Sequence, residues 1–254
     1  MAAAGARADR LRGPRVSLLS SRSVREFRLV VFDWDGTLMD SIGTIVECTL
    51  AAIAEVPGIV APPAATIRGA IGLGLVQTME RFFPAGDPAL FDQVALAYRR
   101  RWRADFKDRV VLLPGAFEAV RAIAGAGYFV GVATAKGRLG LERELDSSGL
   151  RPYFHSTRTV DEAPSKPAPG MLLQLCEEMG VAPRETLMVG DTAWDLEMAR
   201  NAGCASVGVL TGGHGRADLE PCAPLACLGS VAELPGWLGA LPAEVEPAPR
   251  ALAP

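Results

Sequence analysis

The sequence predicts an α/β fold whose parallel sheet is interrupted by a helical insertion. Short apolar runs alternate with helical patterns through residues 112–240, which is typical of a sheet wound with helices. The apolar runs are continuous and do not alternate with polar residues, which indicates strands buried on both faces of a parallel sheet. Residues 40–110, after the first run, show helical patterning and no convincing strand.

The first strand is expected at Leu29–Phe32, four apolar residues that lead directly into Asp33. Similar apolar runs predict strands at Phe129–Ala133, Leu187–Val189 and Ser206–Leu210. Helical patterns between them cover Phe117–Ala124, Leu139–Ser147, Met171–Met179 and Leu196–Ala202. A glycine follows each of these helices, where a left-handed residue is favoured, at Gly127, Gly149, Gly180 and Gly203. Together these elements predict a Rossmann-like parallel sheet core over residues 27–39 and 112–240.

The inserted segment, residues 40–111, is expected to form an α-helical cap domain. Its helical candidates, which proline- and glycine-containing stretches separate, are Thr44–Glu55, Leu75–Phe83 and Pro88–Asp108. An insertion after the first strand can lie over the C-terminal end of that strand, and open α/β sheets bind ligands at this edge. We therefore expect the cap to be a lid over a binding site.

Both ends of the chain differ in composition from the rest. Residues 1–26 are rich in arginine and serine and are interpreted as a disordered or targeting extension. They lack the apolar segment of a secretory signal, but residues 1–25 have the composition of an organellar transit peptide. Residues 241–254, rich in alanine, proline and glutamate, are expected to form a loose tail. A cytoplasmic location is expected, with an organellar one as the alternative.

The composition excludes several classes of protein. Hydrophobic residues make up 49% and charged residues 22%, as in ordinary soluble domains, and no apolar run approaches the ~18 residues of a membrane span. The net charge of −3 gives no reason to expect nucleic-acid binding, and the run Arg99–Arg103 is read as a solvated helix face. The five cysteines match no zinc or disulfide framework, which favours a reducing compartment.

Two acidic residues directly follow the first strand, in the segment Asp33-Trp34-Asp35-Gly36-Thr37. Residues two apart on an extended chain point to the same side, so Asp33 and Asp35 can face one reaction centre. Neighbouring carboxylates raise each other's proton affinity. This favours a division between an ionised nucleophile or metal ligand and a proton carrier. The alternative is an acidic turn, because Asp-Gly is a common turn dipeptide.

Three further segments carry polar residues beside predicted strands and helices. Thr134 closes the second apolar run, and a hydroxyl beside backbone amides suits a phosphate oxygen. Lys166, one of only three lysines, precedes a helix in Ser165-Lys166-Pro167 and can neutralise a phosphate, or else is a solvated loop charge. Asp191 and Asp195, four apart after the third run, suit a hard cation, the alternative being compensation of a helix dipole.

In this order the segments resemble the motifs of haloacid dehalogenase superfamily phosphatases with a helical cap, most closely the phosphoglycolate phosphatase branch. The segments are DWDGTLMDS (33–41), VATAK (132–136), SKP (165–167) and GDTAWDLEMARNAGC (190–204). The resemblance extends from Leu29 to Leu210. It implies a phosphatase that acts on a small phosphomonoester, with phosphoglycolate favoured.

The resemblance also implies a role for each matching residue. Asp33 would attack phosphorus and form an aspartyl-phosphate, and Asp35 would act as acid and then as base. Mg²⁺ would be held by Asp33, Asp191 and the backbone carbonyl of Asp35. Phosphate oxygens would be bound by Thr134 and Lys166. Asp195 would support the metal shell or Lys166.

Several relatives share these motifs. The second acid, Asp35, argues against carbon–halogen cleavage, in which the leaving halide needs no proton. Residues 40–106 contain no lysine, which argues against a Schiff-base phosphonate hydrolase. A pyrophosphatase, a sugar-phosphate phosphatase or mutase, and a catalytically silent regulatory module stay open.

The cap is expected to select the substrate, a small phosphorylated metabolite. Arg68, in the glycine-rich loop 68–74, is the candidate partner for a substrate carboxylate, the alternative being a surface arginine. Neither a nucleic-acid nor a membrane partner is expected. Both a monomer and a homodimer fit the sequence.

Overall fold

A six-stranded parallel sheet forms the centre of the computed structural model, which describes residues 27–83 and 86–239. Its strands lie in the order β5-β4-β1-β6-β7-β8. Their bounds are β1 Leu29–Phe32, β4 Phe129–Thr134, β5 Ser156–Thr159, β6 Thr186–Gly190, β7 Ala205–Val209 and β8 Cys227–Leu228. The first strand is central, because β1 pairs with β4 on one side and with β6 on the other. The α/β class and the parallel sheet are thereby confirmed.

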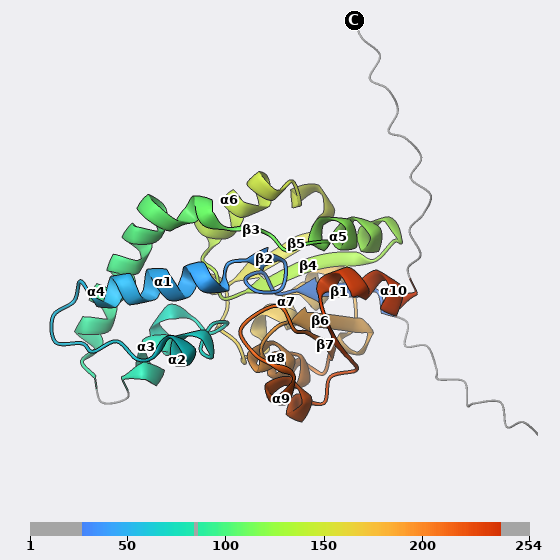
Figure 1. Cartoon of the computed structure of the whole chain (residues 1–254). Coiled ribbons are helices and arrows are strands. Elements are labelled where there is room, and N and C mark those ends of the chain that lie inside the picture. The colour runs from blue at the N-terminus through green and yellow to red at the C-terminus, as the bar shows by residue number, and fades with distance from the viewer. Residues whose placement is uncertain (1–26, 84–85, 240–254) are drawn as a thin grey trace, which may run out of the picture.

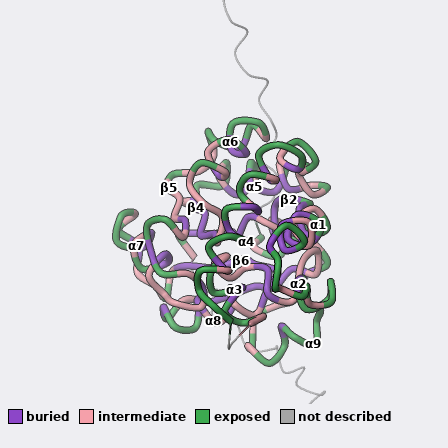
Figure 2. The backbone as a smooth tube through the Cα atoms, turned by 90° about the vertical axis from the view of Figure 1, so that its left-hand side faces the viewer, coloured by how far each residue is buried: buried purple, intermediate pink, exposed green. Residues whose placement is uncertain are grey.

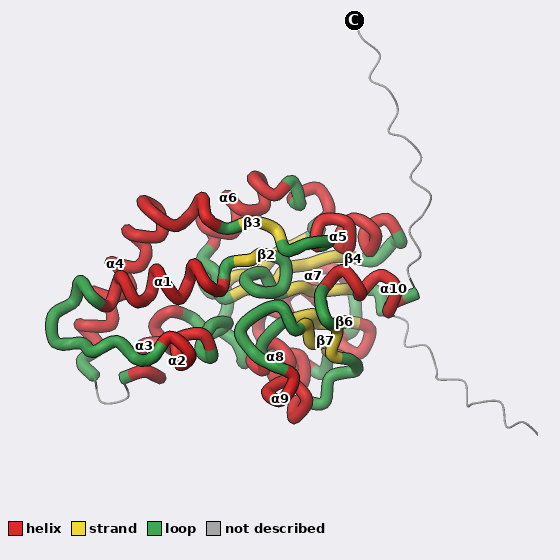
Figure 3. The backbone as a smooth tube through the Cα atoms, in the orientation of Figure 1, coloured by secondary structure: helices red, strands yellow, loops and turns green. Residues whose placement is uncertain are grey.

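Helices cover both faces of this sheet (Figure 1, Figure 3). Successive residues of β1 join opposite apolar cores, with Val30 and Phe32 in one core and Leu29 and Val31 in the other. The first core also takes side chains from α5 (Ala116–Gly125), α6 (Arg138–Ser148) and α10 (Leu234–Leu238). The second takes side chains from α7 (Gly170–Met179) and α8 (Ala193–Ala202). Burial on both faces accounts for the unbroken apolar run of β1.

The chain leaves and re-enters the core through a small antiparallel ribbon. Its two strands are β2 (Met39–Asp40) and β3 (Val111–Leu112), paired Met39 with Leu112 and Asp40 with Val111. Between them lie the helices α1 (Ile42–Ile53), α2 (Ala64–Arg68), α3 (Leu75–Phe82) and α4 (Pro88–Arg101). We call the segment from α1 to Arg109 the cap; Figure 1 shows it projecting beyond one end of the sheet.

The cap has an apolar core of its own and also contacts the rest of the chain. Its core includes Ile53 from α1, Met79 from α3 and Val94 from α4. One contact with the part of the chain that carries the sheet runs through His214, whose Nδ1 accepts from the Ala193 N–H at 2.9 Å. The proton is therefore on Nε2, which donates to a carbonyl of the cap at 3.0 Å, that of Gly69.

Several elements differ from the sequence-based expectation. Strand β5 has the sequence STRT and was not expected, because an edge strand with partly exposed side chains needs no apolar run. The helix expected over Pro88–Asp108 ends at Arg101, and the chain continues as a π-helical segment, η1 (Trp102–Phe106), and one 3₁₀ turn, η2 (Lys107–Arg109). Segments of this kind are frequent at functional sites.

The remaining short elements connect the larger ones. They are η3 Arg151–Tyr153, η4 Pro183–Glu185, α9 Arg216–Leu219, η5 Glu220–Cys222 and η6 Val231–Glu233. Figure 2 shows the buried residues along the strands and the inner helix faces, with exposed residues outside. Within the described ranges, no helix combines the length and the apolar character needed to cross a membrane. The extensions expected at residues 1–26 and 241–254 lie outside the described residues.

Candidate active site

Three of the polar residues singled out in the sequence lie at the same edge of the sheet. Asp33 follows β1, Thr134 is the last residue of β4, and Asp191 follows β6. The strands are parallel and in register here, and the Asp33 N–H donates to the carbonyl of Val189 at 2.8 Å. The C-terminal edge of the sheet therefore carries these side chains toward the cap.

Lys166 ties two of the acidic residues together. Its ammonium contacts the carboxylate of Asp33 and lies 2.6 Å from Oδ1 of Asp195. Burial lowers the pKa of Lys166, but the charges of Asp195 and Asp33 outweigh this effect and raise the pKa above its usual value. Lys166 is thus a buried lysine whose ammonium form is favoured by two neighbouring carboxylates.

Asp33, Asp191 and Asp195 form a cluster of buried carboxylates. One oxygen from each lies within 4.8 Å of the others. Burial raises the pKa of Asp33 well above its usual range, and burial together with the charge of Asp195 raises the pKa of Asp191 to about 6. Such a set of hard oxygen donors, crowded and out of solvent, fits a small divalent cation such as Mg²⁺.

The backbone around Asp191 is shaped to approach its carboxylate closely. Thr37 donates its hydroxyl to Oδ1 at 2.8 Å, and the Gly213 N–H donates to Oδ2 at 2.7 Å. A Cβ atom placed on Gly36 would lie 2.5 Å from that Oδ2, and one on Gly212 would lie 1.8 Å from it. Only glycine leaves room here, so these two positions form a cradle around one carboxylate oxygen.

Asp195 has two roles in the structure, at the start of α8 and beside Lys166. Its Oδ2 accepts hydrogen bonds from the Thr192 N–H at 3.1 Å and from the Thr192 hydroxyl at 2.6 Å, which caps the start of α8. Its Oδ1 faces Lys166. The first turn of α8 thereby holds the Asp195 side chain, which contacts the ammonium of Lys166.

Asp35 lies beside the cluster and has a different partner. Nζ of Lys136 lies 2.9 Å from its Oδ1 and 3.0 Å from its Oδ2. The same ammonium lies 3.1 Å from Oε1 of Glu144 on α6. Burial lowers the pKa of Lys136, and the charges of Asp35 and Glu144 raise it above its usual value, so this side chain is an ammonium as well.

Sequence reasoning missed the partners of Asp35. Lys136 lies within the VATAK segment, but the sequence alone predicts no role for it or for Glu144. One signal pointed to Glu144, since it falls on the same helical face as the buried Leu141 and Leu145, at the spacing of three and one residues. An acid on an apolar face needs a partner.

A cavity of about 560 Å³ lies between the sheet edge and the cap. Its core side includes Asp33, Asp35 and Thr134, whose hydroxyl accepts from the Lys136 N–H at 3.1 Å. Its cap side includes the loop after α2 together with residues of α4 and η1. The site expected under a helical lid is therefore a partly open cavity that residues of both the sheet core and the cap line.

Arg68 is exposed and is not among the residues that line this cavity, and its expected role in substrate binding stays a prediction. The preceding residue, Ile67, is buried, and a step of one residue turns a helix by about 100°, which directs Arg68 outward. The arginines that line the cavity are Arg99 and Arg103 of the cap and Arg143 of α6.

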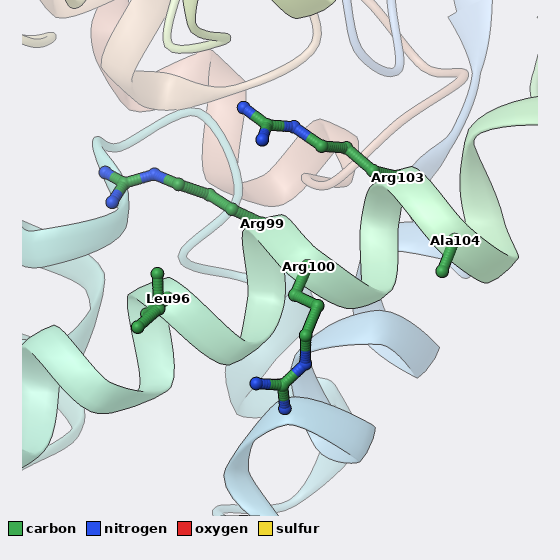
Figure 4. A pocket seen from close by; sticks show the side chains of 5 residues that line it. All are labelled: Leu96, Arg99, Arg100, Arg103 and Ala104. Atoms are coloured by element: carbon green, nitrogen blue, oxygen red, sulfur yellow. The ribbon is translucent and has the colours of Figure 1, made fainter.

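The cap arginines differ in direction. Figure 4 shows Arg99 and Arg103 extending to the same side of the helix, while Arg100 extends to the other side. Arg100 contacts Glu55, as does Arg101. The arginine run is thus divided between ion pairs within the cap and two guanidinium groups at the cavity.

Comparison with known proteins adds to this geometry. A family model described as haloacid dehalogenase-like hydrolase matches residues 30–209. The chain is 32% identical over 220 residues to the protein named probable phosphatase IndB of Dickeya dadantii, covering 84% of this chain and 94% of that one. It is 32% identical over 183 residues to a phosphoglycolate phosphatase of Thiobacillus denitrificans, covering 70% and 80% of the two chains.

A solved structure shows the same fold. The crystal structure of a predicted phosphatase from Clostridium acetobutylicum superposes with a TM-score of 0.76 at 21% sequence identity. The match covers 85% of this chain and 99% of the other. The likeness therefore extends over the cap as well as the sheet.

Proposed function

The chain belongs to the haloacid dehalogenase-like hydrolases, and on this basis we propose that it is a Mg²⁺-dependent phosphatase that uses Asp33 as its nucleophile. The chain is an enzyme of the phosphatase class within this family, a phosphoric monoester hydrolase. The observation that carries the proposal is the contact of Lys166 with both Asp33 and Asp195, inside a cluster of three carboxylates. A nucleophilic carboxylate needs such a cation when a dianionic phosphate approaches.

The proposed reaction has two steps. In the first, a carboxylate oxygen of Asp33 bonds to phosphorus while the ester P–O bond breaks, and Asp35 gives its proton to the leaving oxygen. In the second, water attacks phosphorus and passes its proton to Asp35. The bond between phosphorus and Asp33 then breaks, and inorganic phosphate leaves. At the end Asp33 is again a free carboxylate and Asp35 again carries its proton.

The remaining residues of the site would bind the phosphate group and the metal ion. Lys166 and Thr134 would bind phosphate oxygens, and Asp195 would hold Lys166 in place. Asp33, Asp191 and the backbone carbonyl of Asp35 would hold Mg²⁺. The bound ion would supply positive charge that offsets the charge of the phosphate.

For the substrate we propose a small phosphomonoester with a second anionic group, and phosphoglycolate is the favoured candidate. Arg99, Arg103 and Arg143 line the cavity whose core side holds Asp33. Guanidinium groups recognise carboxylates through paired hydrogen bonds. The relative from Thiobacillus denitrificans is named phosphoglycolate phosphatase, which supports the same choice.

The test is phosphate release from a panel of substrates, with Mg²⁺ and with EDTA. The panel contains phosphoglycolate, pyrophosphate, several sugar phosphates and para-nitrophenyl phosphate. We expect Mg²⁺-dependent release, fastest with phosphoglycolate, and an acid-stable, hydroxylamine-labile phosphoenzyme that Asp33→Asn abolishes. Full activity of Asp33→Asn would end the proposal. Preference for another ester would change the substrate, conversion to an isomer without phosphate release would indicate a mutase, and inactivity throughout would indicate a silent module.

A further inference from the structure

Lys136 lies at the boundary between the sheet core and the cap. It follows β4 by two residues, and its side chain is only 9% exposed. Its ammonium contacts groups from three separate parts of the chain, the segment after β1, helix α6 and the π-helical segment η1 of the cap. A lysine side chain ordinarily extends into solvent, so this degree of enclosure is unusual.

The first contact is with Asp35. Both carboxylate oxygens of Asp35 face the ammonium, at 2.9 and 3.0 Å. Asp35 sits directly before Gly36, where the chain turns with a φ of +87°. The turn sets the direction of the backbone, but the rotation of the carboxylate itself depends on its partner, and among the described residues Lys136 is the one that contacts both oxygens.

The second contact anchors the ammonium from the core. Oε1 of Glu144 lies 3.1 Å from Nζ, and Oε2 of Glu144 accepts from the indole N–H of Trp34 at 2.6 Å. Trp34 is fully buried between the two acids of the first motif. The path from Trp34 through Glu144 and Lys136 therefore returns to Asp35, the residue that follows Trp34 in the chain.

The third contact comes from the cap. The ammonium of Lys136 lies 5.1 Å from the ring centroid of Trp102, within the range of a cation–π interaction. Trp102 is buried and stacks on Tyr98 with ring centroids 5.8 Å apart. It is the first residue of η1, where the cap helix departs from α-helical geometry. The cap thus places a rigid aromatic face against the cation that holds Asp35.

We propose that Lys136 is a positioning residue for Asp35 and that Trp102 makes this positioning depend on the cap. The inference rests on the acid–base role proposed above for Asp35. Fixed between Glu144 and the indole ring, the ammonium holds the carboxylate at one orientation toward the cavity. Proton transfer to a leaving oxygen requires this alignment, and displacement of the cap would release it.

The test exploits the leaving group. An alkyl phosphate needs a proton as its ester bond breaks, whereas para-nitrophenolate leaves readily without one. The rate of phosphoenzyme formation is measured in single turnovers with an alkyl phosphate and with para-nitrophenyl phosphate, alongside kcat and KM. Asp35→Asn serves as the benchmark, since loss of the acid should slow the alkyl substrate far more than the aryl one.

Two variants remove the proposed contacts. Lys136→Met alone would leave the buried Glu144 without its cation, so it is combined with Glu144→Gln, which retains an acceptor for Trp34. We expect this double variant to slow phosphoenzyme formation with the alkyl phosphate about tenfold or more beyond its effect on the aryl phosphate, with KM changed less than about threefold. Trp102→Leu should act in the same direction with a smaller effect, and Trp102→Phe should retain most of the rate.

Matched controls separate positioning from stability. Lys107→Met removes a lysine whose side chain is 37% exposed, and it should change neither rate. Glu144→Gln alone keeps Lys136 but loses the charged anchor of its ammonium, so it should discriminate between leaving groups in the same direction and less than the double variant does. Thermal unfolding of every variant reports the fold, and Lys136→Arg tests whether a cation at this position restores the alkyl rate.

The outcomes are distinct. An equal loss with both leaving groups, or a raised KM with kcat unchanged, would overturn the positioning role, the second result assigning Lys136 to substrate binding. If Asp35→Asn slows the alkyl phosphate more than the aryl phosphate and the Lys136 variant does not, this inference is refuted and the proposed function stands. No discrimination by Asp35→Asn would remove the acid role of Asp35, and this inference with it. A wild-type protein that releases no phosphate would refute the proposed function itself.

Discussion

Lys166 contacts Asp33 from a position that solvent does not reach, since the two side chains are 0% and 3% exposed. Asp195 contacts the same ammonium from the first turn of α8. A cation that is enclosed in this way has a structural as well as a chemical effect, because it offsets the repulsion within the carboxylate cluster.

Replacing Lys166 by methionine should therefore damage both stability and activity. Removing one partner of a buried ion pair leaves uncompensated charge, which costs about 3–5 kcal/mol in unfolding free energy. Phosphate release should fall by about two orders of magnitude or more. Urea unfolding without metal measures the first effect, with Lys107→Met as the exposed control. Unchanged stability of Lys166→Met would show that the carboxylates are neutral in the folded protein.

The raised pKa of Asp191 predicts an unusual pH dependence of stability. With the pKa near 6 in the folded chain and near 3.8 in the unfolded chain, the folded state binds more protons between these values. The contribution of Asp191 to folding therefore improves as pH falls through this window, by about 1 kcal/mol between pH 7 and pH 5. The difference in unfolding free energy between wild type and Asp191→Asn, measured without metal, isolates this effect from other acids.

Saturating Mg²⁺ should abolish that trend. A bound cation favours the ionised carboxylate, so the wild type should gain stability from Mg²⁺ at pH 7 and gain less at pH 5. Asp191→Asn should gain little at either pH. Equal stabilisation of both proteins by Mg²⁺ would place the ion elsewhere.

The cradle around Asp191 offers a steric test. A Cβ atom on Gly212 would lie 1.8 Å from Oδ2 of Asp191, so Gly212→Ala must displace that carboxylate. We expect a loss of Mg²⁺-dependent phosphate release of about a hundredfold, because small displacements of catalytic groups are costly. Gly43→Ala is the matched control, since a Cβ atom there meets nothing within 4 Å and alanine favours the α1 helix. Normal activity of Gly212→Ala would contradict the geometry.

The direction of the cap arginines predicts substrate selectivity. Replacing Arg99 and Arg103 together by alanine should raise KM for phosphoglycolate about tenfold or more, because charge-assisted hydrogen bonds contribute about 1.5–3 kcal/mol. The KM for an uncharged alkyl phosphate should change much less. Arg100→Ala is the control from the same helix, since Arg100 points away and contacts Glu55. Arg68→Ala should resemble that control, and a strong effect of Arg68→Ala would restore the role expected for it from the sequence.

Much of the site was predictable because the sheet is parallel. Asp33, Thr134 and Asp191 each stand at the end of an apolar run, and parallel strands bring such ends to one edge. Lys166 was noticeable because lysine is rare in this chain. These signals are local in the sequence, and each depends on a rule about a single strand or a single loop.

The features that were missed depend on contacts between distant segments. The pair of Lys136 and Asp35 spans 101 residues, and no periodicity links them. The outward direction of Arg68 follows from the end of α2, a five-residue helix that was not expected. Strand β5 was missed because it lies at the edge of the sheet, where partly exposed polar residues can form a strand without an apolar run. For Lys136 and for β5 the deciding contact lies on another element, whereas the direction of Arg68 follows from its own short helix.

The paired strands β2 and β3 place side by side the two points where the chain passes between the sheet core and the cap, with Asp40 opposite Val111. Everything between these residues is an insertion whose ends meet, so it can be exchanged for a different helical unit without shifting the register of the sheet. The residues at the sheet edge and those that select the molecule delivered to it consequently lie on separate parts of the chain. A chimera that joins a foreign cap at this ribbon would acquire a new selectivity, and it would keep the full rate only if that cap also places an aromatic ring against Lys136.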